Sequence, residues 1–338
     1  MCRCLKWGIS HLWAPMSTHS DVKPHLPLPE QIALLKRRGM IIKDDVQATN
    51  TLERLGYYRL SGYFYPLRKT QPRGTLGRQD EFQLGTSLEL IDQLCEFDRE
   101  LRLLVLDAVE RIEVSVRCDI AHRLGQRHSL AHEVPDELDR KFCFAINPRT
   151  KRTEYEDWTL KLNSLMQRAH KEDFVKHHAD KYAGKMPIWV VTEVWDFGLL
   201  SKFYAGMRYK DQTFIARRYG LMEAKYLVSW LRAINFVRNV SAHHSRLWNR
   251  NIVERPGFPP AQPYQYLYHL SGDNHAQTRI YGTLCVLKSM LDCIAPASSW
   301  SDRVKELANR FPKSELITLQ AAGFPRLWDE LPLWQRRV

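Results

Sequence analysis

The sequence predicts an all-α protein, a helical bundle with an additional helical unit at its N-terminal end. Apolar residues recur at intervals of three and four along most of the chain, which is the spacing of amphipathic helices. No Gly-rich phosphate-binding motif, strand–helix alternation or repeat of fixed period is visible. The chain has 338 residues, of which 44% are hydrophobic, so it can bury the core of one or two domains.

The first part of the chain is predicted to contain a tail and a small helical unit. Residues 1–25 hold a segment rich in Pro, Ser and His, so we expect a disordered tail without a signal peptide. Residues 26–68 form the helical N-terminal unit, with helices ending near Gly39 and Gly56. Residues 69–80 combine Pro, Gly and polar residues, and we interpret them as an exposed loop that marks the best internal boundary.

Residues 81–334 are predicted to form the main α-helical domain. Its first element is a long helix that Thr86 or Ser87 could cap, because apolar residues repeat at helical spacing from Leu88 to Val116. One face of this helix must therefore be buried.

The remaining elements are also expected to be helical. Residues 125–155 indicate a loop or short helices, and 156–182 return to a helical pattern. We predict one buried helix over 188–207, with a strand over 188–194 as the alternative. Further helices are expected at 224–249, 278–294 and 301–310, with a Pro-rich loop over 256–263.

The charge distribution favours a polyanion as partner. Lys and Arg outnumber Asp and Glu by 12 in the whole chain. Residues 200–255 contain eleven Lys and Arg against three acidic residues, so this segment alone carries +8. A nucleic acid is a natural ligand for such a concentration of positive charge.

Cysteine usage and hydropathy indicate a soluble, cytoplasmic protein. The seven cysteines are an odd number without a CxxC pair, which is typical of a reducing compartment and offers no structural zinc site. No window approaches about 18 uninterrupted apolar residues, so no membrane association is expected. We predict no metal and no other cofactor.

The segment from Trp230 to Arg250 separates into two faces when it is placed on a helical wheel. Arg238 falls beside the polar stripe, and His244 falls among apolar residues, where we expect it to pack or hydrogen-bond internally. The polar stripe is centred on Asn239 and comprises Arg232, Asn235, Asn239, His243, Arg246 and Arg250.

Histidine and arginine together suit metal-free RNA cleavage. A base removes the ribose 2′-OH proton, the oxygen attacks the adjacent phosphorus, and an acid protonates the leaving 5′-oxygen. Arginine can hold the phosphate and stabilise the added negative charge. The spacing alone favours the simpler interpretation, a basic solvated helix with an ordinary histidine near its end.

Several long blocks in order carry a resemblance to a known family. They include LGYYRLSGYFYPL, FQLGTSLELIDQLCEFDRELRLLVLDAVERIEVSVR, PIWVVTEVWDFGLLSKFY, VRNVSAHHSRLWNR and GFPRLWDELPLW. With these blocks the chain, from about 28 to 334, resembles the Abi family of bacterial abortive-infection proteins, linked to phage resistance, within the HEPN superfamily.

The resemblance implies a HEPN-like helical bundle that forms a homodimer and acts as a metal-independent endoribonuclease toxin. It maps Arg238 and His243 onto the catalytic motif, with Asn239 and His244 in supporting positions. The stripe residues Arg232, Arg246 and Arg250 then become RNA-binding candidates. An antitoxin or a regulatory RNA is a further candidate partner.

Two other functions remain open at this point. The same fold could bind or sense RNA without cutting it, or the basic segment could be a surface that recognises phage proteins.

Other patterns have simpler interpretations. Glu113 and Arg117 are expected to form an i, i+4 ion pair on an exposed helix face, although they could supply an acidic and basic element near the site. His122, His128 and His132 are expected to be solvated rather than metal ligands. The aromatic run from Tyr57 to Tyr65 is expected to be core, with stacking of RNA bases as the alternative.

Overall fold

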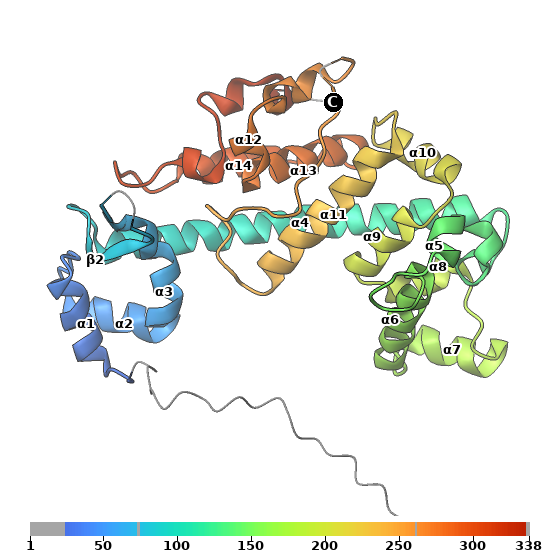
Figure 1. The fold of residues 1–338 in the computed structure, drawn as a ribbon, viewed down its shortest axis with the longest axis horizontal. Coiled ribbons are helices and arrows are strands. Elements are labelled where there is room, and N and C mark those ends of the chain that lie inside the picture. Colours follow the sequence, from blue (N-terminus) through green and yellow to red (C-terminus); the bar gives the residue numbers. More distant parts are fainter. Residues whose placement is uncertain (1–23, 73–74, 261, 336–338) are drawn as a thin grey trace, which may run out of the picture.

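One long helix, α4 (Leu88–Gly125), organises the molecule and confirms the all-α prediction. The computed structural model describes residues 24–72, 75–260 and 262–335, and most of the predicted N-terminal tail lies outside these residues. The 38 residues of α4 span about 57 Å at 1.5 Å per residue. The Ser87 hydroxyl accepts a hydrogen bond from the Leu90 N–H at 3.1 Å, so the predicted cap is Ser87. In Figure 1, α4 runs the width of the molecule, with α1–α3 at one end and α5–α8 at the other.

The N-terminal unit is helical, as predicted, and its helices end at the expected glycines. Gly39 and Gly56 follow the first two helices with φ of 88° and 76°, which a residue without Cβ adopts at no steric cost. The third helix packs on α4. The elements are α1 (Leu28–Arg37), α2 (Asp45–Leu55), α3 (Tyr57–Phe64) and the 3-10 helix η1 (Tyr65–Leu67).

The segment predicted as an exposed loop at 69–80 instead contributes most of a β-hairpin. Strands β1 (Arg68–Thr70) and β2 (Arg78–Phe82) pair antiparallel, with Arg68 opposite Phe82. Phe82 is buried and packs edge-on against Phe64, with ring centroids 5.3 Å apart. This contact with α3 stabilises the hairpin. The loop prediction used only the composition of residues 69–80, so it did not include Phe64.

Short helices occupy the far end of the molecule, in agreement with the pattern over 125–182. The Thr153 hydroxyl accepts from the Glu156 N–H, and the Glu156 carboxylate accepts from the Thr153 N–H, so a capping box starts the longest of them. These elements are η2 (Ala131–Glu133), η3 (Pro135–Glu137), α5 (Arg140–Phe144), α6 (Glu154–Arg168) and α7 (Asp173–Tyr182).

The single buried helix predicted over 188–207 is wrong, and so is the alternative strand. The chain forms α8 (Ile188–Val191), continues as the 3-10 turn η4 (Thr192–Val194), and begins again as α9 (Phe197–Ala205). Asp196 causes the break, because its carboxylate caps α9 by accepting from the Leu199 N–H at 2.7 Å.

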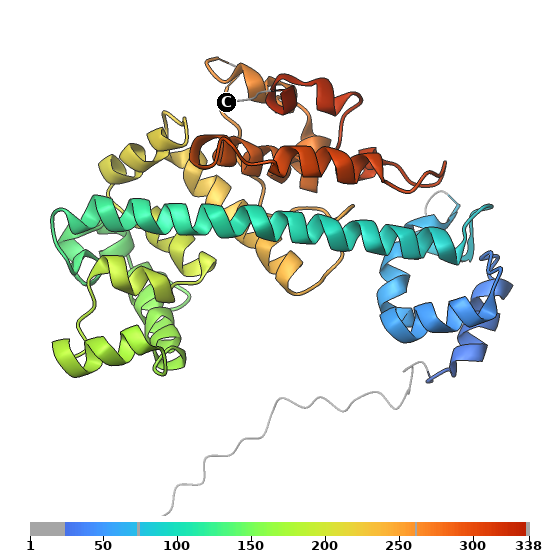
Figure 2. The same cartoon turned by 180° about the vertical axis from the view of Figure 1, so that it is seen from behind.

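The second half of the chain packs along α4. Figure 2 shows α13 and α14 lying beside the long helix. The Trp300 indole N–H donates to the Leu104 carbonyl at 2.8 Å, and Phe97 meets Phe311 edge-on at 4.8 Å. The helices are α10 (Tyr209–Arg218), α11 (Ala224–Ala242), η5 (Gln265–Leu270), α12 (Asn274–Gln277), α13 (Ile280–Ile294), α14 (Trp300–Asn309), η6 (Leu319–Ala322), η7 (Trp328–Glu330) and α15 (Pro332–Gln335).

No helix among the described residues combines the length and the apolar character needed to cross a membrane.

Candidate functional site

Helix α11 carries the candidate Arg238 and Asn239, and it ends earlier than predicted. Its last residue is Ala242, whereas the sequence pattern predicts a helix to residue 249. His244 adopts a left-handed conformation with φ of 55°, and the Ser245 N–H donates back to the Val240 carbonyl at 3.0 Å. Such a residue commonly terminates a helix. The helical-wheel positions of residues 244–250 are therefore wrong, whereas His243, directly after the helix, still lies on the same face as Asn239.

The buried carboxylate of Asp98 explains why the chain turns here. It accepts hydrogen bonds from the Leu247 N–H at 3.1 Å and from the Trp248 N–H at 2.7 Å. It also accepts from the Tyr63 hydroxyl at 2.7 Å and pairs with Arg102 one turn along α4. In a continued helix these two backbone N–H groups would donate to the carbonyls of His243 and His244, four residues earlier, instead of to Asp98.

Sequence reasoning missed Asp98, although a signal is present. The residue interrupts the apolar face of the long helix between Leu94 and Leu101, and an arginine follows four residues later. A charge on a buried stripe needs a partner, and a partner at this spacing is a recognisable pattern.

His243 and Asn239 line an open groove on the surface of α11. Both side chains are exposed, and so is Arg232, which begins the same face of the helix. Phe236 and Glu254 also line the groove, and the Glu254 carboxylate pairs with Arg232 at 2.8 Å. The groove has a volume of about 430 Å³ and brings together four residues of the predicted stripe, Arg232, Asn235, Asn239 and His243.

Arg238 lies half-buried beside this groove rather than in it. Its guanidinium donates to the Asn239 side-chain oxygen at 3.3 Å, so Asn239 connects the arginine with the groove. Its positive charge also acts on two carboxylates, those of Glu113 on α4 and Asp196 at the start of α9. Arg238 therefore lies between the groove and a charged cluster at the crossing of α4, α9 and α11.

The charged cluster contains the ion pair predicted from spacing. Arg117 contacts the Glu113 carboxylate at 2.5 Å, but both side chains are only 15% exposed, so the pair is mostly buried. Burial raises the pKa of Glu113, although the positive charges of Arg117 and Arg238 oppose this shift.

Asp196 completes the cluster as an ionised carboxylate. Burial opposes its ionisation, but hydrogen bonds from Lys161 at 2.8 Å and from the Leu199 N–H outweigh burial, so the pKa lies below its usual value.

The supporting candidate His244 does not pack internally as predicted. Its side chain is exposed, since the left-handed turn directs it away from the face that α11 buries.

Arg246 and Arg250 lie outside the groove because α11 ends before them. The Arg246 guanidinium is half-buried and donates to the Gly62 carbonyl of α3. Burial lowers the pKa of Arg246. Arg250 is partly exposed in the turn that follows the helix. Of the three predicted RNA-binding arginines, Arg232 alone lines the groove with His243.

Two other sequence interpretations change with the structure. His132 is buried rather than solvated, and burial lowers its pKa to about 4, while His122 and His128 are exposed. No cluster of three or more Cys, His, Asp or Glu suited to a metal occurs within the described part of the chain.

The aromatic run at 57–65 is divided between core and surface. Tyr63 and Phe64 are buried as predicted, whereas Tyr58 is 90% exposed and Tyr65 is 45% exposed.

Comparison with known proteins identifies the family to which the chain belongs. A family model described as Abi-like protein matches residues 50–249, which include α4, the charged cluster and α11 through His243. No curated protein and no solved structure matches the chain. Because the matched residues make up more than half of the sequence, the chain belongs to the Abi-like protein family.

Proposed function

We propose that the protein is an abortive-infection effector of HEPN type that cleaves RNA without a metal ion, with the groove on α11 as its site. The observation that carries the proposal is the exposed imidazole of His243 beside Asn239, with the guanidinium of Arg238 bonded to Asn239. Membership of the Abi-like family supports the defence role.

In the proposed reaction, His243 exchanges protons and Arg238 stabilises the phosphate. A base takes the proton of the 2′-OH, and the oxygen forms a bond to the adjacent phosphorus. The bond from phosphorus to the 5′-oxygen breaks, and an acid protonates that oxygen. The products are a 2′,3′-cyclic phosphate and a 5′-hydroxyl end, so DNA, which lacks the nucleophile, is not a substrate.

We further propose that the working unit is a homodimer in which two such grooves face one another. Among the described residues, no hydrogen bond within one chain joins Arg238 to His243. In this dimer Arg238 of each copy acts with His243 of the other copy, so that one arginine and one histidine make up each site.

Cleavage of total bacterial RNA in EDTA tests the proposal. Wild-type protein should release fragments with 2′,3′-cyclic phosphate ends, and His243→Ala should reduce the rate by about 10² to 10⁴-fold, the usual contribution of acid–base catalysis. His170→Ala changes an exposed histidine in the turn after α6 and should leave the rate unchanged. Intact RNA with the wild-type protein, under conditions where it binds RNA, would contradict cleavage.

Mixing two inactive variants tests the dimer. Arg238→Ala and His243→Ala are each inactive in the proposal, but a mixed dimer retains one intact combination of arginine and histidine. Activity should therefore reappear after mixing, and a mixture as inactive as its components would contradict a shared site.

One observation favours non-catalytic RNA binding as the second candidate function. Glu113 and Asp196 lie close enough for the charge of Arg238 to act on both, and this interaction competes with a phosphate for the guanidinium. In that case RNA would bind, and His243→Ala would leave binding unchanged.

A further inference from the structure

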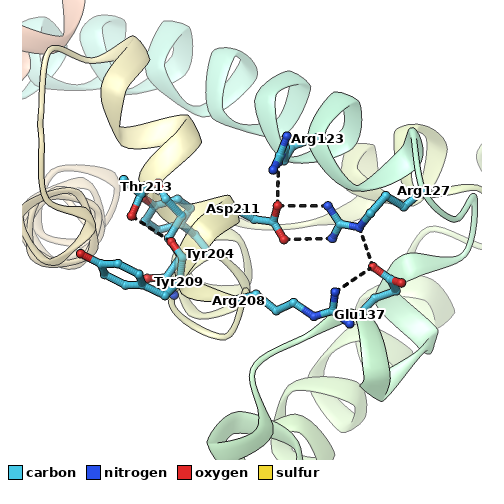
Figure 3. Close-up of polar contacts among 9 residues, drawn as sticks. Arg123, Arg127, Glu137, Tyr204, Arg208, Tyr209, Asp211 and Thr213 are labelled. Atoms are coloured by element: carbon cyan, nitrogen blue, oxygen red, sulfur yellow. Dashed lines mark hydrogen bonds and ion pairs between the residues drawn. The ribbon is translucent and has the colours of Figure 1, made fainter.

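Helix α10 is held rigidly against the C-terminal part of α4 by a buried carboxylate. Figure 3 shows Asp211 between Arg123 and Arg127. The Asp211 side chain is fully buried and accepts from Arg123 Nε at 2.6 Å and from both terminal nitrogens of Arg127 at 3.0 and 2.9 Å. Arg127 also donates to Glu137 at 2.8 Å. This network fixes the inner face of α10, so its outer face is presented in one orientation.

The outer face of α10 combines an aromatic ring with two free cations. Lys210, Phe214 and Arg217 are spaced by four and three residues, so they share one side of the helix. Phe214 is 58% exposed, and the neighbouring Tyr209 is 66% exposed. Neither Lys210 nor Arg217 has an ion-pair partner among the residues that the structure describes.

The ring of Phe214 is a fixed platform. The guanidinium carbon of Arg123 lies 4.3 Å from the ring centroid, and Arg123 is itself held by Asp211. This contact restrains the ring, while more than half of the side chain stays open to solvent. A restrained aromatic ring with free cations beside it is the arrangement by which proteins bind single-stranded nucleic acid, since bases stack on the ring and phosphates pair with the cations.

The surroundings of this face are positively charged even after its ion pairs are counted. Three carboxylates lie in the network, and each is already paired with at least one arginine. Six cations surround them, which leaves a net charge of +3. The cations are Arg123, Arg127, Arg208, Lys210, Arg217 and Arg218, and the carboxylates are Asp119, Glu137 and Asp211.

We propose that Lys210, Phe214 and Arg217 form a contact surface for single-stranded RNA, separate from the groove at His243. The inference rests on the proposed function for its substrate class but assigns no catalytic role to the surface. The surface lies on α10, whereas the groove runs from Arg232 to His243 on the next helix, α11. A single RNA strand that occupies both places must therefore be longer than one that fills the groove alone.

Binding to the cleavage-deficient His243→Ala protein tests the surface without interference from catalysis. The probe is a fluorescein-labelled oligouridylate of 20 nucleotides, and the readout is fluorescence anisotropy in EDTA. Phe214→Leu keeps an apolar side chain but removes the stacking face, so Kd should rise roughly 5- to 150-fold, the cost of one stacked base. Phe214→Trp should bind as tightly as Phe214. Phe144→Leu removes the ring of an equally exposed phenylalanine, 58% exposed at the end of α5, and should change nothing.

The two cations are tested through the salt dependence of binding. Lys210→Gln with Arg217→Gln removes two phosphate contacts, so the slope of log K against log salt should become less steep by about 1.4. Lys176→Gln with Lys185→Gln removes the same charge from another exposed part of the chain and should preserve the slope. Circular dichroism of each variant confirms that it is folded.

Each outcome supports or overturns the surface independently of the proposed function. The surface would be overturned if Phe214→Leu bound the oligonucleotide as tightly as the parent protein, or if the oligonucleotide did not bind at all. It would also be overturned if the salt-dependence slope of the Lys210→Gln, Arg217→Gln variant equalled that of the Lys176→Gln, Lys185→Gln control. Equal competition by polyglutamate would also overturn it, since an acidic protein would then be the better ligand. Stacking at Phe214 without cleavage by the wild-type protein would retain the surface and refute the nuclease. Cleavage at the same rate by wild-type and Phe214→Leu protein would support the nuclease and refute the surface.

Discussion

Asp98 lies on α4 and holds the turn that follows α11. Removing its charge should destabilise the protein far more than removing a surface charge from α4. Asp98 is fully buried and Arg102 is 5% exposed, so Asp98→Asn leaves a guanidinium without a counter-charge in the core. Breaking one side of a buried ion pair costs about 3–5 kcal/mol. Glu100→Gln is the matched control, because its pair with Arg310 is at the surface and should contribute less than about 1 kcal/mol.

Urea unfolding followed by circular dichroism measures the global effect. The transition midpoint of Asp98→Asn should fall with an unchanged slope, and the product of the midpoint shift and the slope gives the loss of unfolding free energy. Hydrogen exchange at the Leu247 and Trp248 amides measures the local effect. A loss of about 3 kcal/mol corresponds to exchange roughly 100-fold faster at these two positions.

A double variant separates the ion pair from the backbone contacts. Asp98→Leu with Arg102→Leu removes both charges, a change that is often neutral for an isolated buried pair. Here it also leaves the N–H groups of Leu247 and Trp248 without an acceptor, at about 1–3 kcal/mol each. The double variant should therefore remain destabilised. A double variant as stable as wild type, or an Asp98→Asn protein no less stable than Glu100→Gln, would refute the role assigned to Asp98.

Four further substitutions have expected outcomes. His132 has a folded-state pKa of about 4 against 6.5 in the unfolded chain, so the unfolded chain binds more protons between these values. Stability should be fully present above pH 6.5 and fall by about 3 kcal/mol towards pH 4, and His132→Phe should flatten this part of the urea-midpoint profile. Gly206→Ala would bring a Cβ within 2.5 Å of the Phe142 ring and should cost about 1–3 kcal/mol, whereas Gly62→Ala, with open space around it, should stabilise α3 by about 0.5–1 kcal/mol. Ser87→Ala removes the cap of α4 and should cost about 1 kcal/mol in the same unfolding assay.

Features that depend on a few neighbouring residues could be predicted from the sequence. The cap at Ser87 and the helix ends at Gly39 and Gly56 follow from side-chain oxygen and glycine chemistry that acts within one turn. The face that α4 buries follows from apolar periodicity in the same way. These predictions are correct because the interactions that determine them are local.

Features that depend on distant partners could not be predicted in the same way. Phe82 completes the hairpin by packing on Phe64, eighteen residues earlier. Neither residue lies within 69–80, so the composition of that segment does not indicate the contact. His132 is also buried, and its carbonyl accepts a hydrogen bond at 3.1 Å from the Tyr155 hydroxyl, 23 residues later. The groove was predicted in part, because Asn239 lies on α11 and His243 directly follows it, but Arg246 turns away to bond Gly62.

The C-terminal helices extend the structural unit beyond the residues that match the family. The match ends at residue 249, directly after the turn that Asp98 holds, yet α4 is buried on another side by segments that follow. Phe97 packs on Phe311, and the Leu104 carbonyl accepts from Trp300 of α14. A chain ending at residue 249 would expose these apolar positions of α4 to water, at roughly 25 cal/mol for each Å² of apolar surface. Helix α4 packs against α11 on one side and against α13 and α14 on another. The stability of the candidate site therefore depends on α13 and α14.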